Sequence, residues 1–161
     1  MSEPEAVPAP KKSVVPMVLG IGCLVLLCSG VLCGGVVGGI AYPNFVSMQM
    51  KAKRSELVGN VNAIKTAELM YDAMNDGFVA AGHPPADGEL GEEPRVWTGG
   101  SDWETLGWSP YEDLRGAYWV EVSGQDFVVH GVADLDGDGV RAEYTATMST
   151  NATLVTPEDV Y

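Results

Sequence analysis

An uncharged apolar run from Val14 to Tyr42 constrains this chain more than any other feature of its sequence. At ~1.5 Å per helical residue the run would extend roughly 40 Å, more than the ~30 Å hydrocarbon core of a bilayer. Pro43 ends the run, and nearly all charged residues follow it. The pattern predicts a cytoplasmic tail over residues 1–13, a transmembrane helix over 14–42 and one small domain over 43–161.

The same run could instead be a targeting segment that is removed. The apolar part of a cleaved signal usually has about 7–15 residues and ends at small residues, whereas this run is about twice as long. A lipoprotein signal is the closer alternative, because two lysines precede the run and Gly22-Cys23 offers a cleavage point. An uncleaved anchor is favoured, because the run continues well past Cys23. The spacing of Gly30, Gly34 and Gly38 predicts self-association through this helix.

The negative charge of the chain lies entirely after the apolar run. The formal net charge is −13, and the four charged residues before the run cancel one another. A surface this acidic repels nucleic-acid phosphates and attracts divalent cations. The charge balance therefore argues against nucleic-acid binding.

An amphipathic helix is predicted over residues 43–76. Its apolar positions recur every three, four or seven residues and are Val46, Met50, Leu57, Val61, Ile64 and Tyr71, and Met70 and Met74 are predicted to widen this stripe. The predicted polar side carries Lys51, Lys53, Arg54, Glu56, Asn60, Asn62, Lys65 and Glu68. Gly77 follows as the expected C-terminal glycine. The apolar stripe needs a covering partner, and the rest of the domain is the obvious one.

The remainder of the domain divides into a loop region and a sheet. Residues 77–116 are rich in glycine, proline and acidic residues, which predicts a long variable loop. Residues 117–161 predict an antiparallel sheet, with strands at 117–123, 126–133, 143–149 and 153–156 and a tight turn at Gly124-Gln125. One face of this sheet would pack on the helix, which makes the domain α+β.

The loop region also holds Trp97, Trp103 and Trp108, for which two interpretations remain open. The three side chains could form a surface for sugars or for a protein partner. Alternatively, Trp103, Leu106 and Trp108 fold over the helix as the core of the loop region, which is the favoured interpretation.

The helix residues resemble the N-terminal helix of bacterial type IV pilins. The resemblance is carried by Ala41-Tyr42-Pro43-Asn44-Phe45, by the basic segment 51–56, by Asn62-Ala63-Ile64-Lys65-Thr66-Ala67-Glu68 and by Tyr71. It implies a pilin-like α+β fold, in which a long N-terminal membrane-spanning helix continues into an amphipathic helix packed on a C-terminal antiparallel sheet. The chain departs from the family at two positions. Gly22 stands where the first mature residue would be, and Leu26 stands where pilins carry a glutamate.

The expected function is that of a membrane-anchored structural subunit, a minor or accessory component of a type IV pilus or of a type II secretion pseudopilus. The resemblance implies a single-pass protein of the bacterial inner membrane with an extracytoplasmic domain, which could enter a surface filament. Its expected partners are the membrane and other pilin-like subunits. The alternative is an anchored, non-polymerising binding module of the cell envelope.

The motif with chemistry of its own is Asp134-Leu135-Asp136-Gly137-Asp138-Gly139. Alternating carboxylates followed by a glycine are how a calcium loop brings hard oxygen ligands around one ion. Thr145 stands where such a loop carries its bidentate glutamate, so Glu143 is the predicted fourth ligand beside Asp134, Asp136 and Asp138. The alternative is an acidic hairpin turn without a metal.

Catalysis finds little support in the sequence. The two histidines, His83 and His130, have no nucleophile or acidic motif of known spacing beside them. We therefore do not expect an enzyme.

Overall fold

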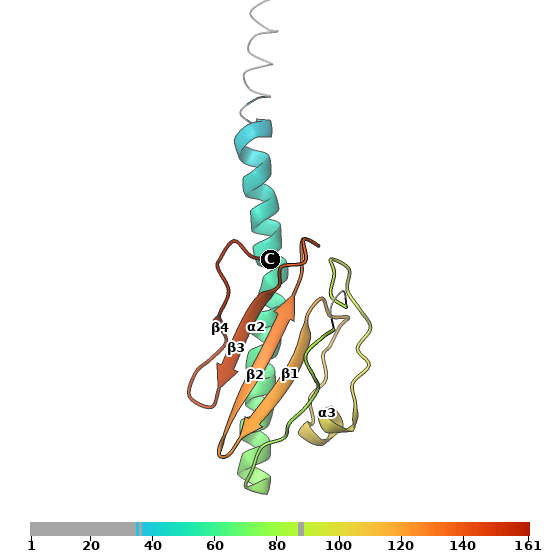
Figure 1. The fold of residues 1–161 in the computed structure, drawn as a ribbon, viewed down its shortest axis with the longest axis vertical. Coiled ribbons are helices and arrows are strands. Elements are labelled where there is room, and N and C mark those ends of the chain that lie inside the picture. The colour runs from blue at the N-terminus through green and yellow to red at the C-terminus, as the bar shows by residue number, and fades with distance from the viewer. Residues whose placement is uncertain (1–34, 36, 87–88) are drawn as a thin grey trace, which may run out of the picture. The chain divides into compact units, whose positions relative to one another are not determined.

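The structure is a computed structural model that describes residues 35, 37–86 and 89–161. The chain divides into two compact units, Met1–Phe45 and Val46–Tyr161. The helical elements are the π-helical turn η1 (Val37–Ala41), the long helix α2 (Tyr42–Asn75) and the short helix α3 (Ser101–Leu106). The strands are β1 (Ala117–Ser123), β2 (Asp126–Ala133), β3 (Ala142–Thr147) and β4 (Thr153–Leu154), as Figure 1 shows.

The predicted fold class, built on a membrane-spanning helix, is wrong for the part of the chain that the structure describes. Within residues 35, 37–86 and 89–161, no helix combines the length and the apolar character that crossing a bilayer needs. The physical reason is that α2 carries charged side chains from Lys51 to Asp72. These charges leave no apolar stretch of about 20 residues. The predicted tail and most of the predicted span, up to Gly34, lie outside the described residues.

The C-terminal end of α2 follows from local backbone chemistry, whereas its start does not stand free, because the π-helical turn η1 runs directly into it. Pro43 has no N–H to donate back to this preceding turn. At the other end, the residue in the left-handed conformation is Asp76, with φ of 57°, and not the predicted Gly77. The Asp76 N–H donates to the Asp72 carbonyl at 2.9 Å, which closes the last turn. Aspartate tolerates this conformation better than most residues, so the left-handed residue that ends the helix comes one position before the glycine.

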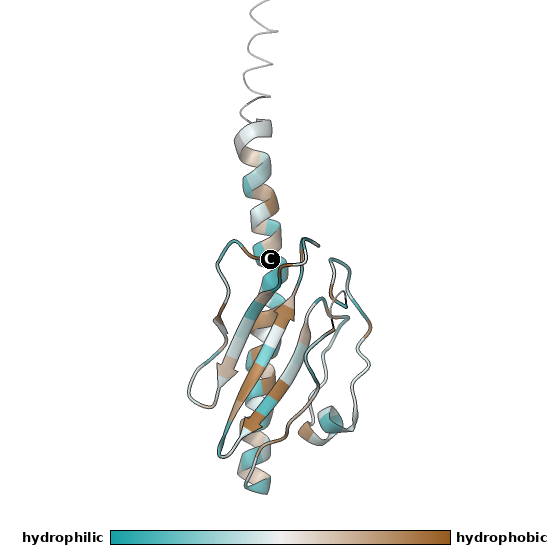
Figure 2. Ribbon diagram, in the orientation of Figure 1, coloured by the Kyte–Doolittle hydropathy of each residue, from teal (hydrophilic) through white to brown (hydrophobic). Residues whose placement is uncertain are grey.

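The sheet is an antiparallel meander with the strand order β1-β2-β3-β4. The predicted turn at Gly124-Gln125 is confirmed, because Ser123 pairs with Asp126 and Gly124 has a positive φ of 63°. β3 and β4 are shorter than predicted and end at Thr147 and Leu154. Side chains alternate between the two faces of the sheet. Figure 2 shows that β2 is mainly hydrophobic and is interrupted by a hydrophilic band.

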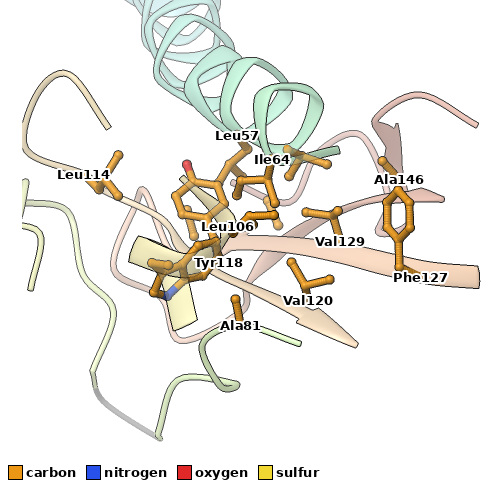
Figure 3. Close-up of a cluster of buried hydrophobic side chains, with 14 of the residues drawn as sticks. Leu57, Ile64, Ala81, Leu106, Leu114, Tyr118, Val120, Phe127, Val129 and Ala146 are labelled. Carbon is orange, nitrogen blue, oxygen red and sulfur yellow. The ribbon is translucent and has the colours of Figure 1, made fainter. Parts of the chain in front are cut away.

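The core lies between α2 and one face of the sheet. Leu57, Val61 and Ile64 project from the helix and are at most 1% exposed. They pack in one cluster with Tyr118 of β1 and Val129 of β2 (Figure 3). Three central members of the predicted stripe are therefore confirmed as core. Met70 and Met74, predicted to widen the stripe, are wrong, because their side chains are 61% and 75% exposed.

Gly131 of β2 allows α2 to approach the sheet closely. A Cβ atom at this position would lie 2.5 Å from Val61 Cγ2 and 3.1 Å from Tyr118 Cδ1. Gly131→Ala is therefore expected to lower the free energy of unfolding by about 1–3 kcal/mol, as overpacked cores do. The matched control is Gly59→Ala on the exposed side of α2, where a Cβ would meet nothing within 4 Å. This control should raise stability by about 0.5–1 kcal/mol through helix propensity. Urea unfolding measures both, and equal effects of the two substitutions would contradict this packing.

Two charged residues of the predicted polar side of α2 are buried. Arg54 is 7% exposed, and its guanidinium Nη1 donates to the backbone carbonyls of Glu158 at 3.0 Å and Val160 at 2.8 Å. Glu68 is 0% exposed, and its Oε2 accepts the N–H of Val79 at 3.0 Å. The placement of both residues on a solvated face is wrong, because the C-terminal segment and the loop after α2 cover the helix beside the sheet.

Candidate functional site

The acidic loop, residues 134–139, connects β2 to β3 and is shaped by its first aspartate. Asp134 is 6% exposed, and its two carboxylate oxygens accept the N–H groups of Gly137 at 2.8 Å and Gly139 at 3.0 Å. Both glycines have positive φ angles, 72° and 85°, which other residues adopt at a cost. The loop is therefore folded around one buried carboxylate.

The loop is also anchored to the core and to the last residues of the chain. The Leu135 side chain is 1% exposed and belongs to the main hydrophobic cluster. Its N–H donates to the Tyr161 carbonyl at 3.0 Å. These two contacts hold Asp134 and Asp136, on either side of Leu135, in place.

The three aspartates of the loop come together. One carboxylate oxygen each from Asp134, Asp136 and Asp138 lie within 4.8 Å of one another, and Asp136 and Asp138 are exposed. Desolvation in the loop raises the pKa of the Asp136 carboxyl, and the negative charges of Asp138 and Asp134 raise it further. A cation between the carboxylates would relieve this repulsion. The arrangement is an acidic triad that could bind a metal.

Glu143, the predicted fourth ligand, lies on β3 and is engaged elsewhere. Its Oε1 is 3.0 Å from Nδ1 of His130, and its backbone N–H donates to the Thr156 hydroxyl at 3.2 Å. Within the described residues, the group of converging carboxylates contains the three aspartates without Glu143. His130 also stacks on Trp119, with the rings parallel and their centroids 4.5 Å apart. Both contacts give His130 a structural position on the outer face of the sheet.

A further carboxylate reaches the acidic loop from a distant part of the chain. Glu92 Oε1 lies 3.0 Å from the point where a Cβ on Gly137 would stand. Sequence analysis missed this residue, because nothing in the segment around Glu92 marks it as a neighbour of the loop.

The tryptophan cluster consists of Trp97, Trp103 and Trp108. Ring centroids are 5.1–5.3 Å apart for each pair, with edge-on or tilted geometry. Trp103 is 4% exposed and Leu106 is 5% exposed, which confirms that both belong to the core. Trp97 and Trp108 are only half-buried. The cluster is thus partly core and partly surface, with Trp97 and Trp108 packed against the main hydrophobic cluster, and the interpretation as a binding surface stays a prediction.

Comparison with known proteins returns no match: no family model, no curated protein and no solved structure is similar to this chain. The resemblance to type IV pilins therefore rests on the helix residues alone and stays a prediction.

Proposed function

We propose that this chain is a pilin-like structural subunit that assembles with other copies of itself or with similar subunits. The observation that supports this function is the distribution of positive charge over an acidic chain with a net charge of −13. Among the lysines and arginines that the structure describes, five contact other parts of the same chain, and they are Arg54, Lys65, Arg95, Arg115 and Arg141. Lys51 and Lys53 of α2 are the two described cations without such a contact, which leaves them available to an acidic partner.

The exposed face of α2 supports the same proposal. Met48 and Met70 are 70% and 61% exposed at its two ends. The residues between them at helical spacing are small and exposed, and they are Ala52, Ser55, Gly59, Ala63 and Thr66. Small side chains let another helix approach closely, and the methionines adapt to irregular contacts. A second subunit could therefore pack on this face while its acidic surface meets Lys51 and Lys53.

Charge substitution on α2 tests this proposal. Lys51→Gln together with Lys53→Gln is expected to shift the full chain toward the monomer in sedimentation velocity, because attraction to an acidic partner is lost. Higher ionic strength should weaken association of the wild type in the same direction.

The matched control changes the net charge equally at positions away from α2. Tyr111→Glu together with Val155→Glu lowers the net charge by two, as the loss of two lysines does, at side chains that are fully or mostly exposed. This control should associate nearly as the wild type does. A wild type that is monomeric at every salt concentration, or a control that loses association as fully as the lysine variant, would contradict the proposal.

For the acidic triad we propose calcium as the metal. Carboxylate oxygens are hard ligands, and three of them on a loop with two glycines resemble the first half of a calcium loop. Glu92 is available from the neighbouring segment, whereas Glu143 would have to leave His130 to join the triad. We expect weak affinity, near the millimolar range of extracellular modules. Such weak affinity would suit an extracytoplasmic location of the domain, and we propose this location as well.

A calcium titration tests the metal directly. At about ten times the dissociation constant, calcium should stabilise the wild type by about 1.4 kcal/mol and raise its melting temperature accordingly. The Asp136→Asn, Asp138→Asn double variant should abolish this rise. The exposed pair Glu104→Gln, Glu112→Gln removes two carboxylates elsewhere and should keep it. If calcium gives the wild type no rise at all, the metal proposal fails.

The alternative function is a monomeric binding module of the cell envelope. The half-buried Trp97 and Trp108 favour it, because aromatic side chains at a surface are typical of binding sites. Monomeric wild type in the sedimentation experiment would support this alternative.

A further inference from the structure

A cavity of about 310 Å³ opens beside the tryptophan cluster. It lies between the loop that leaves α2, the segment before α3 and the start of β1. The lining side chains that matter here are His83, Glu89, Arg95, Trp97, Asp102 and Trp103. Its volume falls at the lower end of the range found for small-molecule sites, about 300–1,000 Å³.

The aromatic wall of this cavity is held in place. Trp97 contacts Trp103 and Trp108 edge-on, at 5.3 Å between centroids in each case. On another side of the ring, a Cβ atom on Gly99 would lie 2.6 Å from Trp97 Nε1, so the backbone there packs directly against the indole. Because Trp97 is nevertheless half-buried, part of its ring is available to a ligand. A ring fixed before binding loses little conformational entropy when the ligand arrives.

The polar side chains of the cavity are also fixed. Arg95 pairs with Glu89 at 3.6 Å and donates to the Gly116 carbonyl at 3.3 Å, while its backbone pairs with that of Leu114. The Asp102 Oδ2 accepts the Gly82 N–H at 2.6 Å. A guanidinium supplies donors only, and the two carboxylates supply acceptors. The cavity thus offers hydrogen-bond donors and acceptors at fixed positions. Because the two carboxylates outnumber the one guanidinium, the cavity does not favour phosphate or other anions.

We propose that this cavity binds a neutral saccharide. Sugar hydroxyls both donate and accept, which matches the Arg95, Glu89 and Asp102 side chains, and the C–H face of a pyranose ring suits the exposed part of the Trp97 indole. A second hollow of about 440 Å³ shares Trp97 and Trp103 and continues to Trp108. The proposed ligand is therefore an oligosaccharide of more than one sugar ring, long enough to reach from the cavity into the second hollow. This site is independent of subunit assembly and would serve either of the functions considered above.

The test titrates the full chain with three neutral tetrasaccharides, cellotetraose, tetra-N-acetylchitotetraose and maltotetraose. Intrinsic tryptophan fluorescence and isothermal titration calorimetry provide the readouts. At least one of the sugars should bind saturably, and Trp97→Ala should weaken that binding at least tenfold, in line with the loss of one stacking platform. Glu89→Gln, at a side chain that is 43% exposed, should weaken it several-fold without disturbing the aromatic cluster.

The control is Trp119→Phe on the opposite face of the sheet, which should leave binding unchanged. Melting temperatures of all variants separate loss of binding from loss of folding, and Glu89→Gln keeps the test valid if Trp97→Ala unfolds. The proposal is overturned if none of the three sugars binds. It is equally overturned if the affinity of a well-folded Glu89→Gln variant equals that of the wild type.

Discussion

Replacing Glu68 by glutamine is expected to flatten the pH dependence of stability between about pH 5 and pH 8. Burial raises the pKa of the Glu68 carboxyl from 4.5 to about 7, although the hydrogen bond from the Val79 N–H counteracts part of the shift. The side chain is 0% exposed, and within the described residues its Oε1 has no hydrogen-bond partner. The ionised form is therefore poorly solvated in the folded protein.

The direction of the effect follows from the two pKa values. Below pH 4.5 the carboxyl is protonated in both states and contributes nothing to the pH dependence. Between pH 4.5 and 7 the unfolded chain releases the proton while the native state keeps it, so stability falls as the pH rises. Since one pKa unit corresponds to about 1.4 kcal/mol, the wild type should lose about 3 kcal/mol through this group across that window.

Urea unfolding of the wild type and of Glu68→Gln at several pH values measures the effect. The difference between the two free energies should change by about 3 kcal/mol from pH 5 to pH 8, in favour of the variant at high pH. The exposed Glu104→Gln serves as the control and should keep the wild-type profile. Parallel profiles for the wild type and Glu68→Gln would show that Glu68 ionises normally, which would contradict its burial.

Arg54→Met is expected to destabilise the domain by about 3 kcal/mol. The guanidinium donates to two backbone carbonyls of the C-terminal segment and lies 5.2 Å from the centroid of the Tyr161 ring. A hydrogen bond to a charged group contributes about 1.5–3 kcal/mol, and methionine preserves the packing of the aliphatic stem. The loss should also loosen Tyr161, whose carbonyl holds the acidic loop through Leu135.

The matched control for Arg54→Met is Lys51→Met, which removes a cation from the same helix at an exposed position. Its effect on the free energy of unfolding should stay within about 0.5 kcal/mol. Hydrogen exchange at the Leu135 amide reports the loosening of the C-terminal segment. Equal unfolding free energies for the two variants would contradict the role assigned to Arg54.

The sequence predicts those features whose determinants are local. The hairpin of β1 and β2 needs only alternating apolar residues and Gly124, and both are visible in the chain. The core positions Leu57, Val61 and Ile64 follow from their helical spacing, because residues at this spacing share the face of α2 that the sheet covers. Likewise, the triad of Asp134, Asp136 and Asp138 follows from the spacing of carboxylates within one loop.

The features that sequence analysis missed depend on contacts between distant segments. Arg54 and Glu68 look solvent-facing on a helix with one buried side, but the C-terminal segment and the loop after α2 cover them as well. Glu143 is predicted as a ligand in place of Thr145, but the register pairs His130 with Thr145, and Glu143, two residues before Thr145, contacts His130 diagonally instead. The membrane-spanning helix is predicted from residues that lie mostly outside the described ones, and within the described ones no helix is long and apolar enough to cross a bilayer.

The central claim is that the lysines of α2 contact an acidic surface of another subunit, and zero-length cross-linking tests it most directly. Full chain labelled with ¹⁵N is mixed with unlabelled chain, treated with a carbodiimide, digested and analysed by mass spectrometry. We expect mixed-isotope cross-links in which Lys51 or Lys53 is joined to an aspartate or glutamate of the other copy. Cross-links from these two lysines that are confined to peptides of one isotope, or their complete absence, would contradict it.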